Sequence, residues 1–416
     1  MKSASNTLSE TPLNDVTAGI DWARDDHAVC IVDARGRRVA HTMVEHTAVG
    51  LRELVGFLAG NGVCEVAIER PDGPIIEALL EAGLTVVVIS PNQVKNLRGR
   101  YGSAGNKDDR FDAYVLADTL RTDRPRLRRL QPDTPSTIAL RRTCRARKDL
   151  VSHRVAAANQ LRAHLRNVLP GAVGLFADID SEIALAFLTR FTTQAQADWL
   201  TPTRLGVWLA QTGYSGRTSP EVLHARLTAA PRGLTGPEAD NEAGITRALL
   251  ALLTTLVEQI KTLSAQISAQ LDTHADQHIF TSLPRAGRVR AARLLAEIGD
   301  ARGRFPTADS LACLAGVAPS TRQSGKITAV SFRWGADKQL RDALCDFAGD
   351  SRHANPWAAD LYDKARARGH DHPHTIRILA RAWLHIIWHC WQNNLSYDPA
   401  QHHALQRILN TKNQAA

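Results

Sequence analysis

The chain has 416 residues, enough for two or three domains, and its hydrophobic (44%) and charged (22%) contents are ordinary for a soluble protein. The six cysteines are scattered and include no CxxC pair, which excludes a disulfide-framed secreted domain and a zinc knuckle. The N-terminus is too polar for a signal peptide, and no apolar run is long enough to span a membrane. We therefore expect a reduced cytoplasmic protein. The net charge of +9 is uneven: residues 98–166 carry +10 and residues 281–345 carry +6, a footprint of polyanion binding that a solvated basic surface would also give.

The N-terminal part reads as a disordered lead-in over residues 1–14, followed by an α/β domain over residues 15–130. Apolar alternation and short apolar runs predict five strands, over residues 16–24, 27–33, 38–44, 63–68 and 84–89. Helical spacing predicts helices over residues 47–60 and 73–82. Three strands followed by alternating helix and strand indicate a mixed sheet covered by helices.

A Gly/Ser loop over residues 101–106 leads into a helix that begins near Asp109. Asp109 and Asp112 lie three residues apart, so both carboxylates share one face of this helix. An arginine-rich segment over residues 121–129 follows. A long helix is then predicted over residues 134–168, with Thr134 as its N-cap and a proline at its first position.

Residues 131–278 are predicted to form a helical, coiled-coil oligomerisation region with an insertion near residues 170–244, to which the sequence assigns no fold. A heptad seam runs through Leu249, Leu253, Leu256, Ile260, Leu263 and Ile267. Its partner is the 134–168 helix of the same chain or another subunit. Residues 279–395 are predicted to form a mainly α C-terminal domain, and residues 396–416 a tail.

Two further acids stand at predicted strand ends. Asp21 ends the first strand and Glu69 follows the fourth, so the edge of the sheet could bring both to the Asp109/Asp112 helix. Four carboxylates are hard oxygen donors, which suit Mg²⁺ or Mn²⁺ rather than zinc. Two such ions would activate a nucleophile and stabilise a leaving oxygen in phosphoryl transfer. Solvated surface acids are the alternative interpretation.

The segments Gly19-Ile20-Asp21, Ile68-Glu69 and Asn106–Ala113 resemble the acidic motifs of the DEDD transposases of bacterial insertion sequences, in the family called IS-one-ten. The resemblance implies a RuvC-like, ribonuclease H type N-terminal domain, a metal-binding tetrad of Asp21, Glu69, Asp109 and Asp112, and guidance by a structured RNA. Many members follow the glutamate with Ala-Thr-Gly, whereas this chain has Arg70-Pro71-Asp72-Gly73. Arg70 is therefore a candidate phosphate contact or a structural ion-pair partner.

The same family has a serine signature in its C-terminal domain. Residues 283–300 resemble its Leu-Pro-Gly-Ile-Gly segment with Arg285 in place of the first glycine, and Ser320 to Lys326 resembles its Ser-Gly-Lys segment. The resemblance makes Ser324 the nucleophile that forms a phosphoserine link to DNA. From the sequence alone, a turn-capping role is the more common one for such a serine. Ser320 lacks the adjoining glycine.

Basic residues near these motifs are the predicted nucleic-acid contacts. They are Lys107, Arg110, Arg126, Arg128, Arg129, Arg288, Arg322, Lys326 and Arg333. Arg290 and Arg293 would add charge to the 283–300 segment.

The residues and the family resemblance together predict a homo-oligomeric DNA transposase or recombinase that uses Mg²⁺ or Mn²⁺ and binds donor and target DNA, and the resemblance implies a guide RNA. Its two catalytic domains could come from different subunits. A metal-only junction nuclease and a non-catalytic nucleic-acid scaffold are the alternatives. A sugar-kinase-like ATPase would need Gly-rich phosphate loops, which are not evident in the sequence.

Overall fold

The computed structural model describes residues 8–101, 108–325 and 327–415, with side chains described to residue 411. The chain divides into two compact units. Unit 1 is Met1–Asp133 with Ala301–Pro306, and unit 2 is Thr134–Asp300 with Thr307–Ala416. The short return segment belongs to unit 1 because the Asp133 carboxylate accepts hydrogen bonds from the Ala301 backbone N–H (3.1 Å) and the Arg304 guanidinium (3.0 Å).

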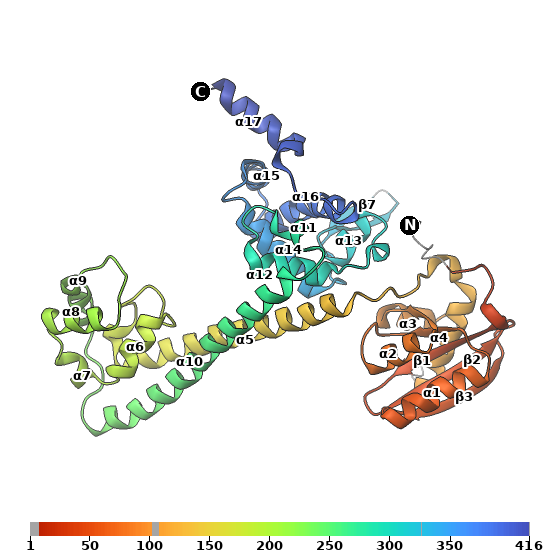
Figure 1. The fold of residues 1–416 in the computed structure, drawn as a ribbon, viewed down its shortest axis with the longest axis horizontal. Helices are drawn as coiled ribbons and strands as arrows, with labels where there is room; N and C mark the ends of the chain where they lie inside the picture. The colour runs from red at the N-terminus through yellow and green to blue at the C-terminus, as the bar shows by residue number, and fades with distance from the viewer. Residues whose placement is uncertain (1–7, 102–107, 326, 416) are drawn as a thin grey trace. The chain divides into compact units, whose positions relative to one another are not determined.

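Unit 1 is built on a five-stranded mixed sheet (Figure 1). Its elements in chain order are β1 (Val16–Trp22), β2 (Asp26–Asp33), β3 (Arg38–Glu45), α1 (Ala48–Gly60), β4 (Glu65–Ile68), α2 (Pro74–Glu81), β5 (Thr85–Val88), α3 (Pro91–Arg98) and α4 (Asp109–Thr122). The strand order is β3-β2-β1-β4-β5, with β2 antiparallel to β1 and β3, and β4 parallel to β1 and β5. The predicted mixed α/β sheet is confirmed.

The two faces of the sheet are covered by different helices. Ile20 and Ile68 pack with apolar residues of α1 and α2, whereas Ala67 and Val87 pack with residues of α3 and α4. This division follows from strand geometry, in which successive side chains point to opposite faces. The face covered by α4 is the one that matters for the acidic residues described below.

The first described residues pack against unit 1. Leu8 is buried, and the Arg124 guanidinium donates to the Ser9 carbonyl while forming a fully buried ion pair with Glu65. Leu8 and Ser9 of the expected lead-in thus pack against unit 1, residues 1–7 lie outside the described chain, and disorder of the lead-in stays a prediction. Removing either member of such a pair typically costs about 3–5 kcal/mol because the remaining charge is buried without compensation.

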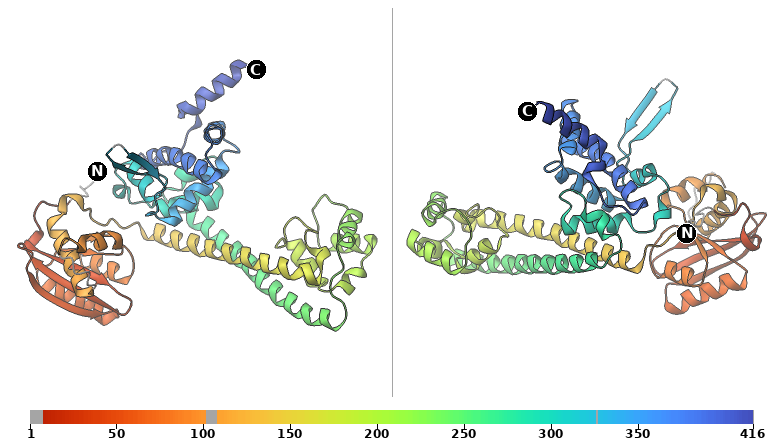
Figure 2. Two further views of the ribbon diagram at one scale, coloured as in Figure 1. Left: turned by 180° about the vertical axis from the view of Figure 1, so that it is seen from behind. Right: turned by 45° about the horizontal axis from the view of Figure 1, so that its top comes forward.

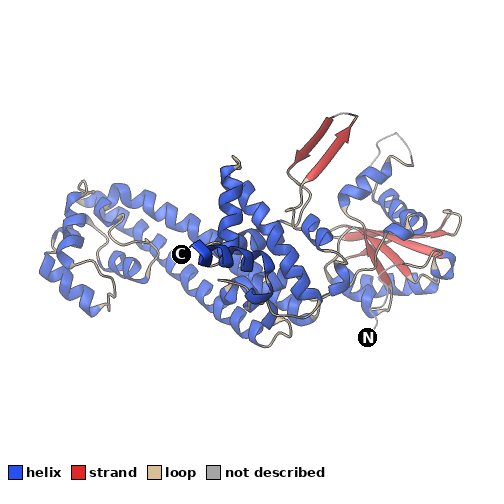
Figure 3. Cartoon of the chain, turned by 90° about the horizontal axis from the view of Figure 1, so that it is seen from above, coloured by secondary structure: helices blue, strands red, loops and turns tan. Residues whose placement is uncertain are grey.

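Unit 2 is almost entirely helical (Figure 3). Its elements are α5 (Pro135–Val168), α6 (Glu182–Arg190), α7 (Gln194–Asp198), α8 (Pro202–Gln211), α9 (Pro220–Ala229), α10 (Pro237–Asp272), α11 (Gln277–Thr281), α12 (Gly287–Ile298), α13 (Ala308–Leu314), β6 (Ser320–Ser324), β7 (Ile327–Ser331), α14 (Lys338–Ser351), α15 (Pro356–Ala367), α16 (His372–Gln392) and α17 (His403–Ala415). The predicted helical C-terminal part is confirmed.

Helices α5 and α10 run side by side, with α6–α9 at one end of the pair (Figures 1 and 2). Thr134 caps α5 by accepting from the Thr137 N–H, and a proline takes the first position, as predicted. In the predicted seam, Leu253, Leu256, Ile260 and Ile267 are buried. Helix pairing within the chain is thus observed, while a supercoiled coiled coil and its role in oligomerisation stay predictions.

The long helix α10 also passes the length and composition test for a membrane-spanning helix. An 18-residue window has a mean hydropathy of 1.3, and 39% of that window is buried. The expectation that no such segment exists was wrong by this criterion. The same test is met by core helices of soluble proteins, and here the buried side of α10 packs on α5.

The insertion that the sequence left unassigned forms four short helices, α6–α9. Phe176, Phe187, Phe191 and Trp208 contact one another edge-on or tilted within its core, at centroid distances of 5.0–5.9 Å. Each helix begins at a Ser or Thr N-cap. The insertion therefore has an aromatic core that also packs on α5 and α10 residues.

Candidate active site

The first turn of α4 lies against the end of β1 because β1 has a glycine where the helix crosses it. A Cβ on Gly19 would lie 2.1 Å from the Ala113 carbonyl oxygen and 2.4 Å from the Ala117 nitrogen. The Thr17 hydroxyl, on the same face, donates to the Ala117 carbonyl (3.0 Å). Strand alternation puts Asp21 on this face as well, so close approach of α4 sets the distance between its acids and Asp21.

Asp108 fixes where α4 begins. Its side chain accepts a hydrogen bond from the Arg110 N–H (3.1 Å), which makes it the N-cap. Asp109 and Asp112 then occupy the first turn, where negative charge interacts favourably with the helix dipole. Because α4 begins at Asp109, the carboxylates of Asp109 and Asp112 lie three residues apart on one face of the helix.

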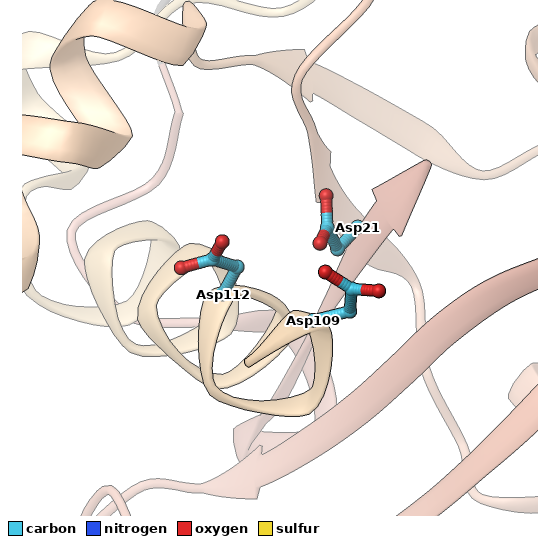
Figure 4. A group of neighbouring side chains, drawn as sticks. All are labelled: Asp21, Asp109 and Asp112. Carbon is cyan, nitrogen blue, oxygen red and sulfur yellow. The ribbon is translucent and has the colours of Figure 1, made fainter. Parts of the chain in front are cut away.

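Three of the four predicted acids form one group (Figure 4). Asp21, Asp109 and Asp112 each offer a carboxylate oxygen, and these oxygens all lie within 4.8 Å of one another. Asp21 and Asp112 are buried and Asp109 is exposed. The group therefore has two fixed acids and one that faces solvent, an arrangement that leaves a side open to a substrate.

Glu69 lies outside that group of three but at the neighbouring strand end. Ile68 pairs with Ile20 across the parallel β1–β4 ladder, so Glu69 and Asp21 follow in register. Alternation from Ala67 places Glu69 toward the α4 face. Glu69 is half-buried, and its charge acts on the same guanidinium as Asp21 and Asp112. The structure thus brings Glu69 to the edge of the group.

That guanidinium belongs to Arg98, a residue that sequence reasoning missed. Arg98, at the end of α3, donates from Nε and Nη2 to the two carboxylate oxygens of Asp112. This hydrogen bonding raises the pKa of Arg98, and the charges of Asp112, Glu69 and Asp21 add to the rise. Each oxygen of Asp112 accepts one hydrogen bond from Arg98 and keeps a second lone pair, so Arg98 would compete with a metal ion for the negative charge of Asp112 without occupying every ligand position.

Arg70 also has an aromatic partner. Its guanidinium lies 4.4 Å from the centroid of the Trp22 ring, next to Asp21 in β1. A cation–π contact of this kind contributes about 0.5–1 kcal/mol at an exposed site. The structure adds this contact to the two roles considered for Arg70 from the sequence.

Ser324 lies in unit 2, on a two-stranded ribbon formed by β6 and β7 (Figure 3). It ends β6, pairs with Ile327 and is exposed. Gly325 follows with φ +56°, a left-handed conformation that favours glycine in the turn. Arg322 is two residues before Ser324 and so shares its face of the ribbon. Ser320 is half-buried at the base of the ribbon.

The predicted nucleic-acid contacts fall into three sets. Those that are exposed and have no role assigned above are Arg110, Arg126, Arg128, Arg129 and Arg322, while Arg288 is exposed but paired. Two others are engaged in the structure: Arg288 pairs with Asp272, and Arg333 donates to the Ala318 and Pro319 carbonyls, both at 3.2 Å. Lys107 and Lys326 lie outside the described residues. Phosphate binding stays a prediction for all of them.

The 283–300 segment keeps a tight turn without the family's glycine. Arg285 adopts φ +54°, which costs a non-glycine residue about 1–2 kcal/mol. Its guanidinium bonds the Asp350 carboxylate (3.0 Å), and this contact lowers the pKa of Asp350. Arg290 also pairs with Asp350, and Arg293 pairs with Asp346. Charge in this segment is therefore balanced by acids of α14.

Comparison with known proteins identifies the family. A family model described as a transposase, of the DEDD type named for IS110, matches residues 18–170, and one described as the IS116/IS110/IS902 transposase family matches residues 277–363. The chain is 33% identical to the "Mini-circle putative transposase for IS117" of Streptomyces coelicolor over 396 residues, which are 92% of this chain and 95% of that protein. The chain belongs to the IS110 (IS-one-ten) family of transposases. Both predicted motif regions lie within the matched residues.

The comparisons also find a second insertion-element protein and a solved structure. An IS900 protein of Mycobacterium paratuberculosis, described as uncharacterized, is 28% identical over 92% of this chain and 98% of its own length. A solved structure, Thermus thermophilus RuvC in complex with a Holliday junction substrate, aligns with 28% of this chain and 99% of its own, at 19% identity and a TM-score of 0.23.

Proposed function

We propose that this insertion-sequence transposase cleaves and rejoins DNA with two sets of residues, the acids of unit 1 and Ser324 of unit 2. The observation that carries the proposal is the assembly of Asp21, Asp109 and Asp112 from a strand end and a helix turn, with their oxygens within 4.8 Å. Carboxylates held this close repel one another, and a cation relieves the repulsion. Arg98 supplies one positive charge at Asp112, and a divalent metal ion would supply the rest.

The donor set fits a divalent metal. Asp21, Asp109 and Asp112 supply hard oxygens, and Glu69 stands at the adjacent strand end, so these residues would hold Mg²⁺ or Mn²⁺. When bound, the metal would act as a Lewis acid on the scissile phosphate. Burial holds the carboxylates of Asp21 and Asp112 in place as metal ligands, while Asp109 is exposed on the side from which a phosphate can approach.

Ser324 is the proposed nucleophile. Its Oγ attacks phosphorus, so the Oγ–P bond forms and the bond from phosphorus to the 3′ oxygen breaks. The serine proton is lost and the departing 3′ oxygen gains one, which leaves a phosphoserine and a free 3′-hydroxyl. Attack by a 3′-hydroxyl of another strand reverses these steps and releases Ser324. Exposure of Ser324 on a protruding ribbon, beside Arg322, supports this role.

A structured guide RNA and an oligomeric state complete the proposal. The +10 block of residues 98–166 and the exposed Arg126, Arg128 and Arg129 support polyanion binding, and the family resemblance supports RNA. In an oligomer whose sites combine unit 1 of one subunit with unit 2 of another, mixing the inactive variants Asp109→Asn and Ser324→Ala would restore strand cleavage.

The role of the acids is tested by comparing Asp109→Asn with Asp108→Asn. Asp109→Asn removes a ligand charge and should lower strand cleavage by about a hundredfold or more, with a matching loss of Mn²⁺ affinity in calorimetry. Asp108→Asn keeps a good N-cap and should retain both properties. Cleavage by Asp109→Asn at the wild-type rate would contradict the proposal.

A metal-only junction nuclease is the second candidate. It is favoured by one observation: the acid group assembles entirely within unit 1, from β1 and α4. Under that candidate the nucleophile is water, and Ser324 has no chemical role. The two candidates differ in whether protein becomes covalently attached to DNA.

A further inference from the structure

The loop that follows β7 carries the most exposed large hydrophobic side chain among the described residues. Trp334 is 83% exposed, compared with 56% for Trp199, the other tryptophan among the exposed large hydrophobics. Tryptophan is a large apolar side chain, and leaving its ring in water forgoes the favourable free energy of burial. The exposure therefore calls for a partner that covers the ring.

The surroundings of Trp334 are aromatic and cationic. Phe332 meets the Trp334 ring at a centroid distance of 4.9 Å and an interplanar angle of 85°. The guanidinium groups of Arg341 and Arg377 lie 5.0 Å and 4.8 Å from the Phe332 centroid. Arg333 ties the loop to the Ala318 and Pro319 carbonyls. The tryptophan is thus presented on a supported aromatic base rather than on an isolated loop.

One of these cations has a buried nitrogen that makes no hydrogen bond within the described residues. The Nη1 atom of Arg341 is buried and has no hydrogen-bond partner among the described residues. A buried donor without a partner costs about 1–3 kcal/mol, more when it is charged. Arg341 is therefore held beside Phe332 by packing and its cation–π contact, without a hydrogen bond from Nη1.

The sequence around the loop is purely basic. From residue 310 to residue 336 there is no Asp or Glu, whereas Arg322, Lys326 and Arg333 are present. An apolar protein partner would gain nothing from this charge, but a phosphate backbone would. Charge complementarity therefore favours a nucleic acid as the molecule that covers Trp334.

We propose that Trp334, supported by Phe332, Arg341 and Arg377, is a stacking platform for an unpaired nucleobase. Stacking needs an open base face, which a paired and stacked duplex hides, so the ligand is a single-stranded or extruded nucleotide of DNA or RNA. The inference rests on the proposed function because it assumes a nucleic-acid substrate. It adds that the segment beside the Ser324 ribbon holds a strand through its bases as well as its phosphates.

The experiment uses the full chain in EDTA and a single-stranded oligonucleotide containing 2-aminopurine, whose fluorescence falls when the base stacks on an indole. Trp334→Ala should lose the quenching and bind about 5- to 100-fold more weakly. Trp334→Phe should retain most of both, which shows that the loop still folds. Trp199→Ala, which removes an exposed indole with Arg204 4.2 Å from its ring centroid, should behave like wild type. DNA and RNA versions of the oligonucleotide show which strand is preferred.

Unchanged quenching and affinity in Trp334→Ala would overturn the platform. A change only in oligomeric state, measured by mass photometry, would also overturn it and assign Trp334 to a protein interface. Binding in EDTA needs neither the acid group nor Ser324, so Asp109→Asn should bind the oligonucleotide normally. If wild type quenches the oligonucleotide in EDTA but does not cleave DNA in a strand-cleavage assay with metal, only the proposed function is refuted. If wild type cleaves DNA but does not quench the oligonucleotide, only the platform is refuted.

Discussion

Replacing Gly19 by alanine should disrupt the acid group without touching any acid. The new Cβ would lie 2.1 Å from the Ala113 carbonyl oxygen, whereas ordinary van der Waals contact begins at 3.4 Å. The Ala117 nitrogen would be 2.4 Å away, and since both of these are backbone atoms of α4, the helix must move by roughly 1 Å. Such overpacking costs about 1–3 kcal/mol of unfolding free energy. Because α4 carries Asp109 and Asp112, a displacement of that size should lower cleavage by about a hundredfold.

The matched control is Gly56→Ala, an exposed position inside α1 where an added Cβ meets nothing within 4 Å. It should stabilise the protein by about 0.5–1 kcal/mol through helix propensity and leave cleavage unchanged. Urea denaturation gives the stability, and Mn²⁺ calorimetry with strand-cleavage rates gives the state of the site. If Gly19→Ala folds, binds Mn²⁺ and cleaves DNA like wild type, the inference that close approach of α4 to β1 sets the site is refuted.

Two other predictions concern groups beside the site. Arg98→Gln should tighten Mn²⁺ binding by about tenfold, because Asp112 then has no competing cation. The control Arg100→Gln, whose partner is Asp123, should leave Mn²⁺ affinity unchanged. Weaker Mn²⁺ binding by Arg98→Gln would contradict this competition. Burial and, to a lesser extent, the charge of His46 lower the pKa of His27 from 6.5 to about 4. As the pH falls, the unfolded chain therefore binds this proton before the folded chain does. The free energy of unfolding should be full above pH 6.5 and should fall toward pH 4 by up to about 1.4 kcal/mol per pH unit. Hydrogen-exchange protection of β1–β3 in the full chain measures this loss, and equal protection at pH 7.5 and pH 5 would count against it.

Local patterns were sufficient to predict the elements that carry the acids. The strand ending near Asp21 and the strand before Glu69 are apolar runs, and their type depends on nothing beyond neighbouring residues. The i,i+3 spacing of Asp109 and Asp112 likewise predicts a shared helical face. Convergence of Asp21, Asp109 and Asp112 was inferable because strand ends and a following helix meet at one edge of a sheet.

The sequence could not predict which arginines form buried ion pairs and with which acids. The arginine-rich segment contains Arg124, which is buried against Glu65, and Arg128, which is exposed, yet the two look alike in the sequence. Arg98 has no spacing relation to Asp112 that would reveal their ion pair. Which cation is desolvated depends on tertiary packing, and local sequence does not encode it.

The insertion was left unassigned although some signals were present. Thr201-Pro202 and Ser219-Pro220 are N-caps followed by proline at the first helical position, and each begins a helix. Helices of five to ten residues are too short to establish a clear 3.6-residue period. Capping signals were therefore the better guide in this region.

The central claim is that the acids of unit 1 act together with Ser324 on one DNA phosphate. The most direct measurement is a denaturing gel of end-labelled DNA after reaction with Mg²⁺, followed by phosphoamino-acid analysis of any protein-linked label. We predict a protein–DNA adduct that yields phosphoserine, is lost in Ser324→Ala and persists in Ser320→Ala. An adduct that survives in Ser324→Ala, or cleavage by wild type with no adduct at any time point, would contradict the account.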